Sequence, residues 1–305
     1  MIHVDCPVCH GGEHRLRWRN AVDRLHGLPG AFTYVQCTQC ELIYLDPQPD
    51  SDSLIDYYPP AYSPHQASPP SSESRRDHAL SDYLSPQRRM EKFIRHRIPG
   101  ASSLLDVGCG RGDFLARMRA TMGCHPHGVD FSRKAVEVAK TLHGLNVFCG
   151  PLASAPFARK SFDLITMWWY LEHDPEPMAT LARCRELLKD TGWLVFGVPN
   201  HRSFNASIFG TRWFHLDAPR HLNIFSPTSI RVLMKRSGFS LQRTDYDRST
   251  WGLVGSLQYL VAGRNFDSSF VISANPLLRL LSLPLTVSLS YLRLSDVVTV
   301  YARSR

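Results

Sequence analysis

Four cysteines near the N-terminus are spaced as metal ligands usually are. They form two C-x2-C pairs, Cys6 with Cys9 and Cys37 with Cys40. Each pair can chelate one metal ion from a tight turn, and four thiolates complete a closed tetrahedral site. The β-prone residues 32–35 lead into the second pair, as a zinc ribbon requires. We therefore predict a structural Zn²⁺ site, with a redox dithiol or unliganded core cysteines as the alternatives.

A glycine-rich turn follows a short apolar run in the middle of the chain. Asp106 precedes three glycines at alternate positions, Gly108, Gly110 and Gly112. Glycine allows a positive φ and lets a ligand approach the main chain closely. The spacing differs from the dinucleotide fingerprint G-x-G-x-x-G, because Asp113 stands where the third glycine would be. The Asp106 carboxylate would repel a pyrophosphate and favour a ligand that carries an ammonium and a sulfonium. The alternative is an ordinary glycine turn of an α/β protein.

A second acid, Asp130, ends the next predicted strand, 22 residues after Gly108. At this distance from a glycine turn, an acid can accept hydrogen bonds from two ribose hydroxyls. The alternative role is to cap the helix predicted over residues 132–141, since Asp and Ser are good N-caps. We favour ribose binding, because the acid also ends a strand.

The elements that must position these residues alternate in type along the chain. The hydrophobic pattern predicts strands over residues 104–107, 126–132, 145–150, 161–170, 193–198, 239–246 and 296–302, and helices over 80–98, from 113, over 132–141 and over 176–189. Strands that alternate with helices predict an α/β fold with a doubly wound parallel sheet.

Three regions are expected along the chain. Residues 1–45 form the zinc-ribbon-like module, residues 46–79 a Pro- and Tyr-rich arm with a flexible linker, and residues 80–305 the α/β domain. Pro47, Pro49, Pro59 and Pro60 exclude a long helix from the arm. Its tyrosines either anchor it to a neighbouring domain or form a lid over a pocket.

An apolar insertion is predicted at residues 248–295. Within residues 277–294, polar side chains recur every three or four positions and form one narrow stripe among leucines. Pro284 would kink such a helix, and the run is too short and too charged at its ends to span a bilayer. Three interpretations of residues 276–294 stay open: a hydrophobic lid over the substrate, a dimer face, and an interfacial membrane helix. The last two favour a lipid-like or membrane-delivered acceptor.

Composition limits the class of protein. The chain has 305 residues, 43% of them hydrophobic, which is enough to bury a full α/β core. Its net charge of +8 comes from dispersed Lys and Arg residues, and nothing resembles a nucleic-acid-binding motif. Because no apolar N-terminal segment precedes Cys6, we expect a cytoplasmic location, with peripheral membrane contact through the insertion as an addition. Cysteines there are metal ligands or core residues more often than disulfides.

Together these features resemble the class I S-adenosylmethionine-dependent methyltransferases. The resemblance is carried by Asp106-x-Gly108-x-Gly110-x-Gly112, Asp130, Ser161-Phe162-Asp163 and Leu171-Glu172-His173. It implies a seven-stranded sheet whose last strand is antiparallel. The two C-x2-C pairs and residues 217–226 look like a narrower branch in which a zinc-ribbon-like segment precedes the domain, as in bacterial sugar C-methyltransferases. We do not expect the further C-terminal domain of those enzymes here.

The resemblance also implies how S-adenosylmethionine would be held. Gly108, Gly110 and Gly112 would pass the backbone under its methionine part, with Asp106 polarising that end. The other implied contacts are Asp130 on the ribose, Phe131 beside the adenine, backbone groups around Leu152 in place of an acid that many relatives have, and Met167 with Trp168 on the methyl-transfer side.

The expected activity is methylation of an oxygen or carbon of a small acceptor: a sugar, a natural product or a lipid-linked molecule. Such transfer needs alignment, and a hydroxyl or acidic carbon also needs a base, for which histidine is best suited near neutral pH. His173 is the first candidate and His221 the second, and Tyr58 with Tyr62 would close the pocket from the arm. Both histidines could instead hold a loop by hydrogen bonds. The alternative function is a non-catalytic protein of the same fold that binds partners through its zinc ribbon and insertion. A homodimer is a separate expectation, which would use the dimer face at residues 276–294.

Overall fold

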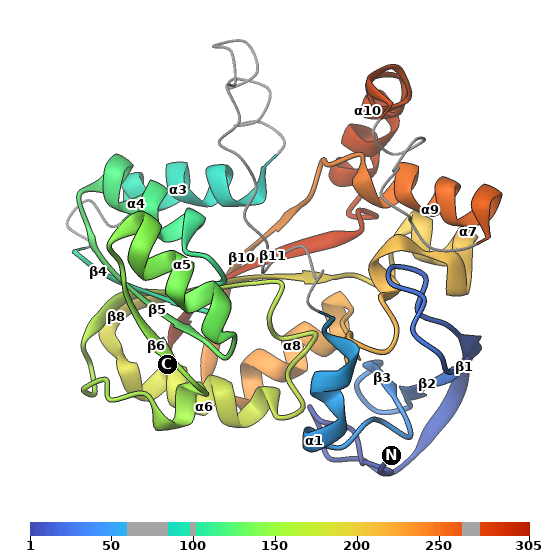
Figure 1. Cartoon of the computed structure of the whole chain (residues 1–305), viewed down its shortest axis with the longest axis horizontal. Helices are drawn as coiled ribbons and strands as arrows, with labels where there is room; N and C mark the ends of the chain where they lie inside the picture. Colours follow the sequence, from blue (N-terminus) through green and yellow to red (C-terminus); the bar gives the residue numbers. More distant parts are fainter. Residues whose placement is uncertain (60–84, 98–101, 264–274) are drawn as a thin grey trace.

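The structure, a computed structural model, describes residues 1–59, 85–97, 102–263 and 275–305 (Figure 1). The strands are β1 His14–Ala21, β2 Phe32–Cys37, β3 Ile43–Leu45, β4 Ser103–Val107, β5 His125–Asp130, β6 Asn146–Cys149, β7 Phe162–Trp168, β8 Leu188–Pro199, β9 Asn223–Ile224, β10 Phe239–Tyr246 and β11 Val297–Ser304. The α-helices are α1 Ser51–Leu54, α3 Pro86–Arg97, α4 Asp113–Met122, α5 Arg133–His143, α6 Pro177–Leu187, α7 Phe204–Phe209, α8 Pro227–Arg236, α9 Trp251–Ala262 and α10 Pro276–Tyr291. Short 3-10 turns cover η1 Ile55–Tyr57, η3 Leu152–Ser154, η4 Gly210–Arg212 and η5 Phe214–Leu216.

Tyr62, most of the predicted linker and residues 80–84 of the first predicted helix lie outside the described residues.

The larger sheet has seven strands in the order β10-β11-β8-β7-β4-β5-β6. Its strands pair in parallel from β8 to β6, whereas β11 runs antiparallel to both β8 and β10. The doubly wound α/β fold with an antiparallel last strand is thus confirmed. The strand predicted over 239–246 has these same bounds in the structure.

Helices cover both faces of this sheet, because side chains of each strand alternate between the faces. In β4, Leu104 packs in a core with residues of α3, α4 and α5, whereas Leu105 packs in a core with residues of α6 and α8. The carboxyl ends of β4, β5 and β7 are therefore held rigidly side by side (Figure 1).

The smaller sheet joins the N-terminal module to a distant segment. Its order is β1-β2-β3-β9, so a strand from residues 223–224 completes the sheet that the first 45 residues begin. Trp18 and Tyr34 share a buried cluster with Trp213 and Leu216. The ribbon therefore shares its sheet and its hydrophobic core with residues 206–224.

The insertion forms α9 and α10, and α10 continues through Pro284. The polar stripe faces inward at Thr286 and Ser290, which are buried, whereas Arg279 and Ser282 are half-buried and Arg293 is exposed. Leu277, Leu280 and Leu281 are instead exposed to solvent. Among the described helices, none is both long enough and apolar enough to cross a membrane.

Candidate functional site

The glycine turn connects the end of β4 to the start of α4. Gly108, Gly110 and Gly112 have φ values of 74°, 52° and 79°, a region that L side chains rarely adopt. A Cβ on Gly108 would lie 2.6 Å from the Tyr170 ring. Only glycine at this position leaves the main chain open toward a ligand.

Asp130 ties the end of β5 to this turn. Its carboxylate accepts hydrogen bonds from the Gly110 and Ser132 backbone N–H groups, both at 2.8 Å. The helix cap, which was the alternative role for Asp130, is supplied by Ser132, whose hydroxyl accepts from the Ala135 N–H.

A cavity of about 1420 Å³ opens above the turn. Nine of the predicted site residues line it: Gly108, Gly110, Asp130, Phe131, Leu152, Trp168, Tyr58, His173 and His221. Apolar side chains make up most of the remaining wall, among them Trp169, Phe214, Tyr259, Leu280 and Leu283. The volume exceeds that of an ordinary small-molecule pocket, so two ligands can fit side by side.

Three predicted cofactor residues, Asp106, Gly112 and Met167, do not line the cavity, and their roles toward the cofactor stay predictions. The Asp106 carboxylate is buried beneath the turn and accepts a 2.6 Å hydrogen bond from the Thr166 hydroxyl. Gly112 is needed for packing, because a Cβ there would lie 2.4 Å from a Leu145 methyl group. Met167 is fully buried in the core between the sheet and its helices.

Two histidines and a tyrosine form the polar end of the cavity. The Tyr58 hydroxyl lies 3.0 Å from His173 Nδ1, and the rings of His173 and His221 meet edge to face with centroids 4.6 Å apart. Tyr58 follows η1 on the arm, His173 follows β7, and His221 precedes β9. The structure thus brings together all three residues that the sequence suggested for catalysis.

Burial changes the protonation of these histidines. It lowers the pKa of His173 to about 3 and the pKa of His221 to about 4. Both imidazoles are therefore neutral at physiological pH and are weaker bases than the sequence alone suggests.

A buried ion cluster that the sequence analysis missed holds the His221 loop. Arg220 is fully buried, donates from Nε to Asp217 at 3.0 Å and from Nη1 to Asp23 at 3.0 Å. Its backbone carbonyl accepts a hydrogen bond from His173 Nδ1 at 3.0 Å. The sequence offers only one signal for this cluster, the position of Arg220 directly before His221.

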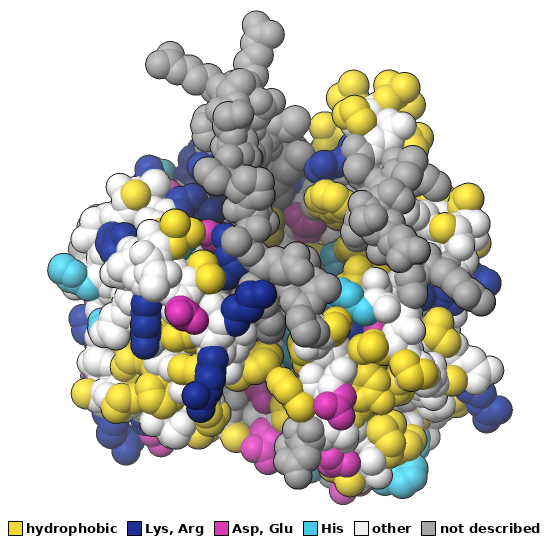
Figure 2. All heavy atoms as spheres, in the orientation of Figure 1, with side chains coloured by type: hydrophobic (Ala, Val, Ile, Leu, Met, Phe, Trp, Pro, Cys, Tyr) yellow, Lys and Arg dark blue, Asp and Glu magenta, His cyan; other side chains and the backbone are white. Residues whose placement is uncertain are grey.

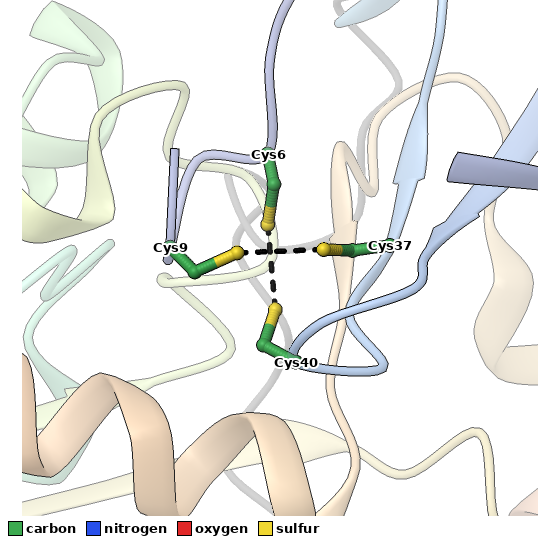
Figure 3. A group of neighbouring side chains, drawn as sticks. All are labelled: Cys6, Cys9, Cys37 and Cys40. Atoms are coloured by element: carbon green, nitrogen blue, oxygen red, sulfur yellow. Dashed lines mark hydrogen bonds between the residues drawn. The ribbon is translucent and has the colours of Figure 1, made fainter. Parts of the chain in front are cut away.

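The four N-terminal cysteines converge on one point (Figure 3). The Sγ atoms of Cys6 and Cys40, and those of Cys9 and Cys37, lie 3.4 Å apart, and all four lie within 4.8 Å of one another. These distances are far longer than the ~2.05 Å of a disulfide. A tetrahedral Zn²⁺ with Zn–S bonds of ~2.3 Å places its sulfurs about 3.8 Å apart, so the group fits the ion.

Comparison with known proteins agrees with this geometry. A model of a family described as "Methyltransferase domain" matches residues 74–244, more than half of the chain. A ubiquinone biosynthesis O-methyltransferase of Paraburkholderia xenovorans is 30% identical over 141 residues, covering 43% of this chain and 60% of that protein. The enzyme of the same name from Thiobacillus denitrificans is 29% identical over 165 residues, covering 50% of this chain and 70% of that protein. The chain therefore spans less than two thirds of the length of the first of these relatives.

Among solved structures, geranyl diphosphate C-methyltransferase from Streptomyces coelicolor A3(2) has a TM-score of 0.51. The match covers 83% of this chain and 97% of that chain, at 15% sequence identity. At this identity the similarity shows the fold alone.

Proposed function

Because this chain belongs to the class I S-adenosylmethionine-dependent methyltransferases, we propose that it methylates a hydroxyl group of a small, largely apolar acceptor. The observation that carries the proposal is one cavity whose wall includes both the glycine turn and the Tyr58–His173–His221 group. A methyl donor and an acceptor can meet in it.

The cofactor end of the cavity fits S-adenosylmethionine. The open backbone at Gly108 and Gly110 suits its methionine part, the Asp130 carboxylate suits the ribose hydroxyls, and the exposed Phe131 ring suits the adenine. When bound, the cofactor supplies an electrophilic methyl group whose C–S bond breaks, with the electron pair left on sulfur, as the acceptor oxygen bonds to carbon.

The acceptor end is aromatic with a few polar groups. Trp168, Trp169 and Phe214 exclude water from the reacting groups, and the Tyr58 hydroxyl lies where it can hold an acceptor oxygen in line with the methyl group. The neutral rings of His173 and His221 accept hydrogen bonds there but are too weakly basic to take a hydroxyl proton efficiently. The names of the relatives support oxygen as the methylated atom, and the apolar wall favours a lipid-linked acceptor over a sugar.

We also propose that α10 rests on a membrane that holds this acceptor. Hydrophobic side chains gather over α10 at the upper right of Figure 2. Leu277, Leu280 and Leu281 of this helix are exposed. Leu280 also lines the cavity, so the exposed face borders its opening. Residues 248–263 and 275–295 contain Arg248, Arg279 and Arg293 but no acid, which suits anionic lipids.

The four-cysteine group is proposed to hold a structural Zn²⁺ ion. Four thiolates form a closed set with no open position for a substrate, which is typical of structural sites. The group shares its hydrophobic core with Phe225 and the α8 residues Ile230 and Leu233, so the ion would also stabilise the neighbouring sheet face.

The test of the proposed activity is transfer of a labelled methyl group from S-adenosylmethionine to a dihydroxybenzene that carries an isoprenoid tail. We expect an O-methylated product, and a lower kcat/KM for the same ring without its tail. An absence of transfer to any hydroxyl acceptor by protein that binds S-adenosylhomocysteine would support the non-catalytic alternative.

A further inference from the structure

A buried carboxylate directly before His173 has no hydrogen-bond partner among the described residues, although it does not itself line the cavity. Glu172 is fully buried, and neither of its carboxylate oxygens has a hydrogen-bond partner among the described residues. Its burial raises the pKa to about 8. A proton on Glu172 would not satisfy the group, because no described acceptor lies within hydrogen-bond distance to receive it. This unpaired acid needs another explanation.

Two imidazoles face the same space as Glu172. One potential ligand atom from each of Glu172, His173 and His221 lies within 4.8 Å of the other two. Both rings are oriented by backbone carbonyls, since His173 Nδ1 donates to the Arg220 carbonyl at 3.0 Å and His221 Nδ1 donates to the His215 carbonyl at 2.9 Å. With the proton on Nδ1, Nε2 of each ring carries a lone pair. A carboxyl group and two imidazole rings, each ring oriented by a backbone carbonyl, therefore converge on one space.

We propose that Glu172, His173 and His221 form a site for a divalent transition-metal ion, with Zn²⁺ the best match, next to the acceptor. Two histidines and one glutamate are a ligand set of catalytic zinc sites, which keep an open position for an oxygen ligand. Histidines that bind a metal commonly donate their other N–H to a backbone carbonyl, as both do here.

The geometry and the charge both fit such an ion. Two ligand atoms that each lie ~2.1 Å from one Zn²⁺ are at most about 4.2 Å apart. The potential ligand atoms of this group lie within 4.8 Å of one another, so a small side-chain rotation would bring them to that distance. A carboxylate and two neutral imidazole nitrogens are the forms in which these side chains bind a divalent ion.

The site deepens the proposed function and rests on it. A cation at this place would polarise the hydroxyl oxygen of the acceptor and lower its pKa, so that the proton is lost to solvent as the acceptor enters, before water is excluded and the oxygen attacks the methyl carbon. The cation would thus promote the loss of the hydroxyl proton, which the weakly basic histidines cannot take efficiently. Asp217 adds negative charge near the site, since its carboxylate lies 3.9 Å from His221 Nε2 while it pairs with Arg220.

The test is the metal content of the full-length protein after dialysis against Zn²⁺, measured by mass spectrometry. We expect two ions per chain in the natural protein and one in both Glu172→Gln and His221→Asn, which keep the cysteine site. The matched control is Asp174→Asn, a buried acid two residues from Glu172 that is not in the group and should keep two ions.

Cobalt distinguishes the two sites. Co²⁺ bound by four thiolates gives intense sulfur-to-metal charge-transfer absorption, whereas Co²⁺ bound by histidine and carboxylate gives only weak visible bands. In Glu172→Gln the charge-transfer absorption should persist and the weak bands should disappear. One ion per chain in the natural protein, with cobalt spectra that Glu172→Gln does not change, would overturn the metal site. If the natural protein binds only one ion but still transfers methyl groups, the metal site fails and the proposed function survives. If the natural protein binds no S-adenosylhomocysteine, the proposed function fails whatever its metal content.

Discussion

At the scale of single residues, Tyr58, His173 and His221 come from three distant segments of the chain. They meet because contacts with other segments hold the loops that carry them. Tyr58 contacts His173, and Arg220 holds the loop before β9 through Asp23. The sequence suggested all three residues, but only the structure shows that burial makes the histidines neutral. Their chemistry is therefore alignment and ligand binding more than proton abstraction.

His173→Ala and His221→Ala should each lower kcat by roughly 10²-fold, the order expected when the acceptor is no longer held in line with the methyl group. Affinity for S-adenosylhomocysteine should stay within about twofold, because neither residue is at the glycine turn. His96→Ala, at the exposed end of α3, is the control and should change neither quantity. Unchanged turnover in both cavity variants would remove these histidines from the mechanism.

Asp106 should make stability depend on pH. Burial raises its pKa in the folded protein from 3.8 to about 8, so its contribution to stability is complete below pH 3.8 and is lost as the pH rises toward 8. The free energy of unfolding should therefore fall between pH 6 and pH 8, by at most about 1.4 kcal/mol per pH unit for this group. Urea unfolding of Asp106→Asn should show a shallower fall over the same range. Equal slopes in the two proteins would mean that Asp106 does not titrate in this way.

At the scale of elements, the unusual one is α10, in which Thr286 and Ser290 are buried while Leu277, Leu280 and Leu281 face outward. The sequence predicted the stripe but could not tell which side faces the core, because helical periodicity alone does not say where the rest of the protein lies. The buried hydroxyls find local partners, for instance when the Thr286 hydroxyl donates to the Arg248 carbonyl at 3.2 Å. An outward apolar face then needs a surface to cover it.

Leu281→Glu tests whether that surface is a membrane. Leu281 is 67% exposed and does not line the cavity, so its loss should weaken flotation with phosphatidylglycerol vesicles about tenfold or more while leaving transfer to a detergent-dispersed acceptor intact. Leu142→Glu, on α5 with 63% exposure, is the matched control. Equal flotation of both variants would contradict membrane docking. A concentration-dependent dimer that Leu281→Glu abolishes would identify a second copy as the occupant instead.

At the scale of the whole molecule, the N-terminal ribbon and the α/β domain share a sheet and a buried core. The sequence predicted the strands of the seven-stranded sheet because they are long enough to show a hydrophobic pattern. It missed β9, since a strand of only two residues has no period. It also missed the pairing of Asp23 with Arg220, because contacts between residues 197 positions apart leave no local signal.

Removal of Zn²⁺ from the four cysteines should therefore affect more than residues 1–45. A metal-free ribbon loses folding energy, and β9 loses the neighbour with which it pairs. Hydrogen exchange after chelation should show faster exchange in residues 1–45 and also in residues 206–225, while β4 and β5 stay protected. Loss of protection confined to residues 1–45 would mean that the shared sheet carries little stability.

The central claim is that the turn at Gly108–Gly112 and Asp130 hold the methyl donor. The most direct measurement is calorimetric titration of the full chain with S-adenosylhomocysteine. We predict one binding site per chain and at least tenfold weaker binding by Asp130→Ala, because both ribose contacts are lost. No binding heat from the natural protein, or the same affinity in Asp130→Ala, would contradict the account.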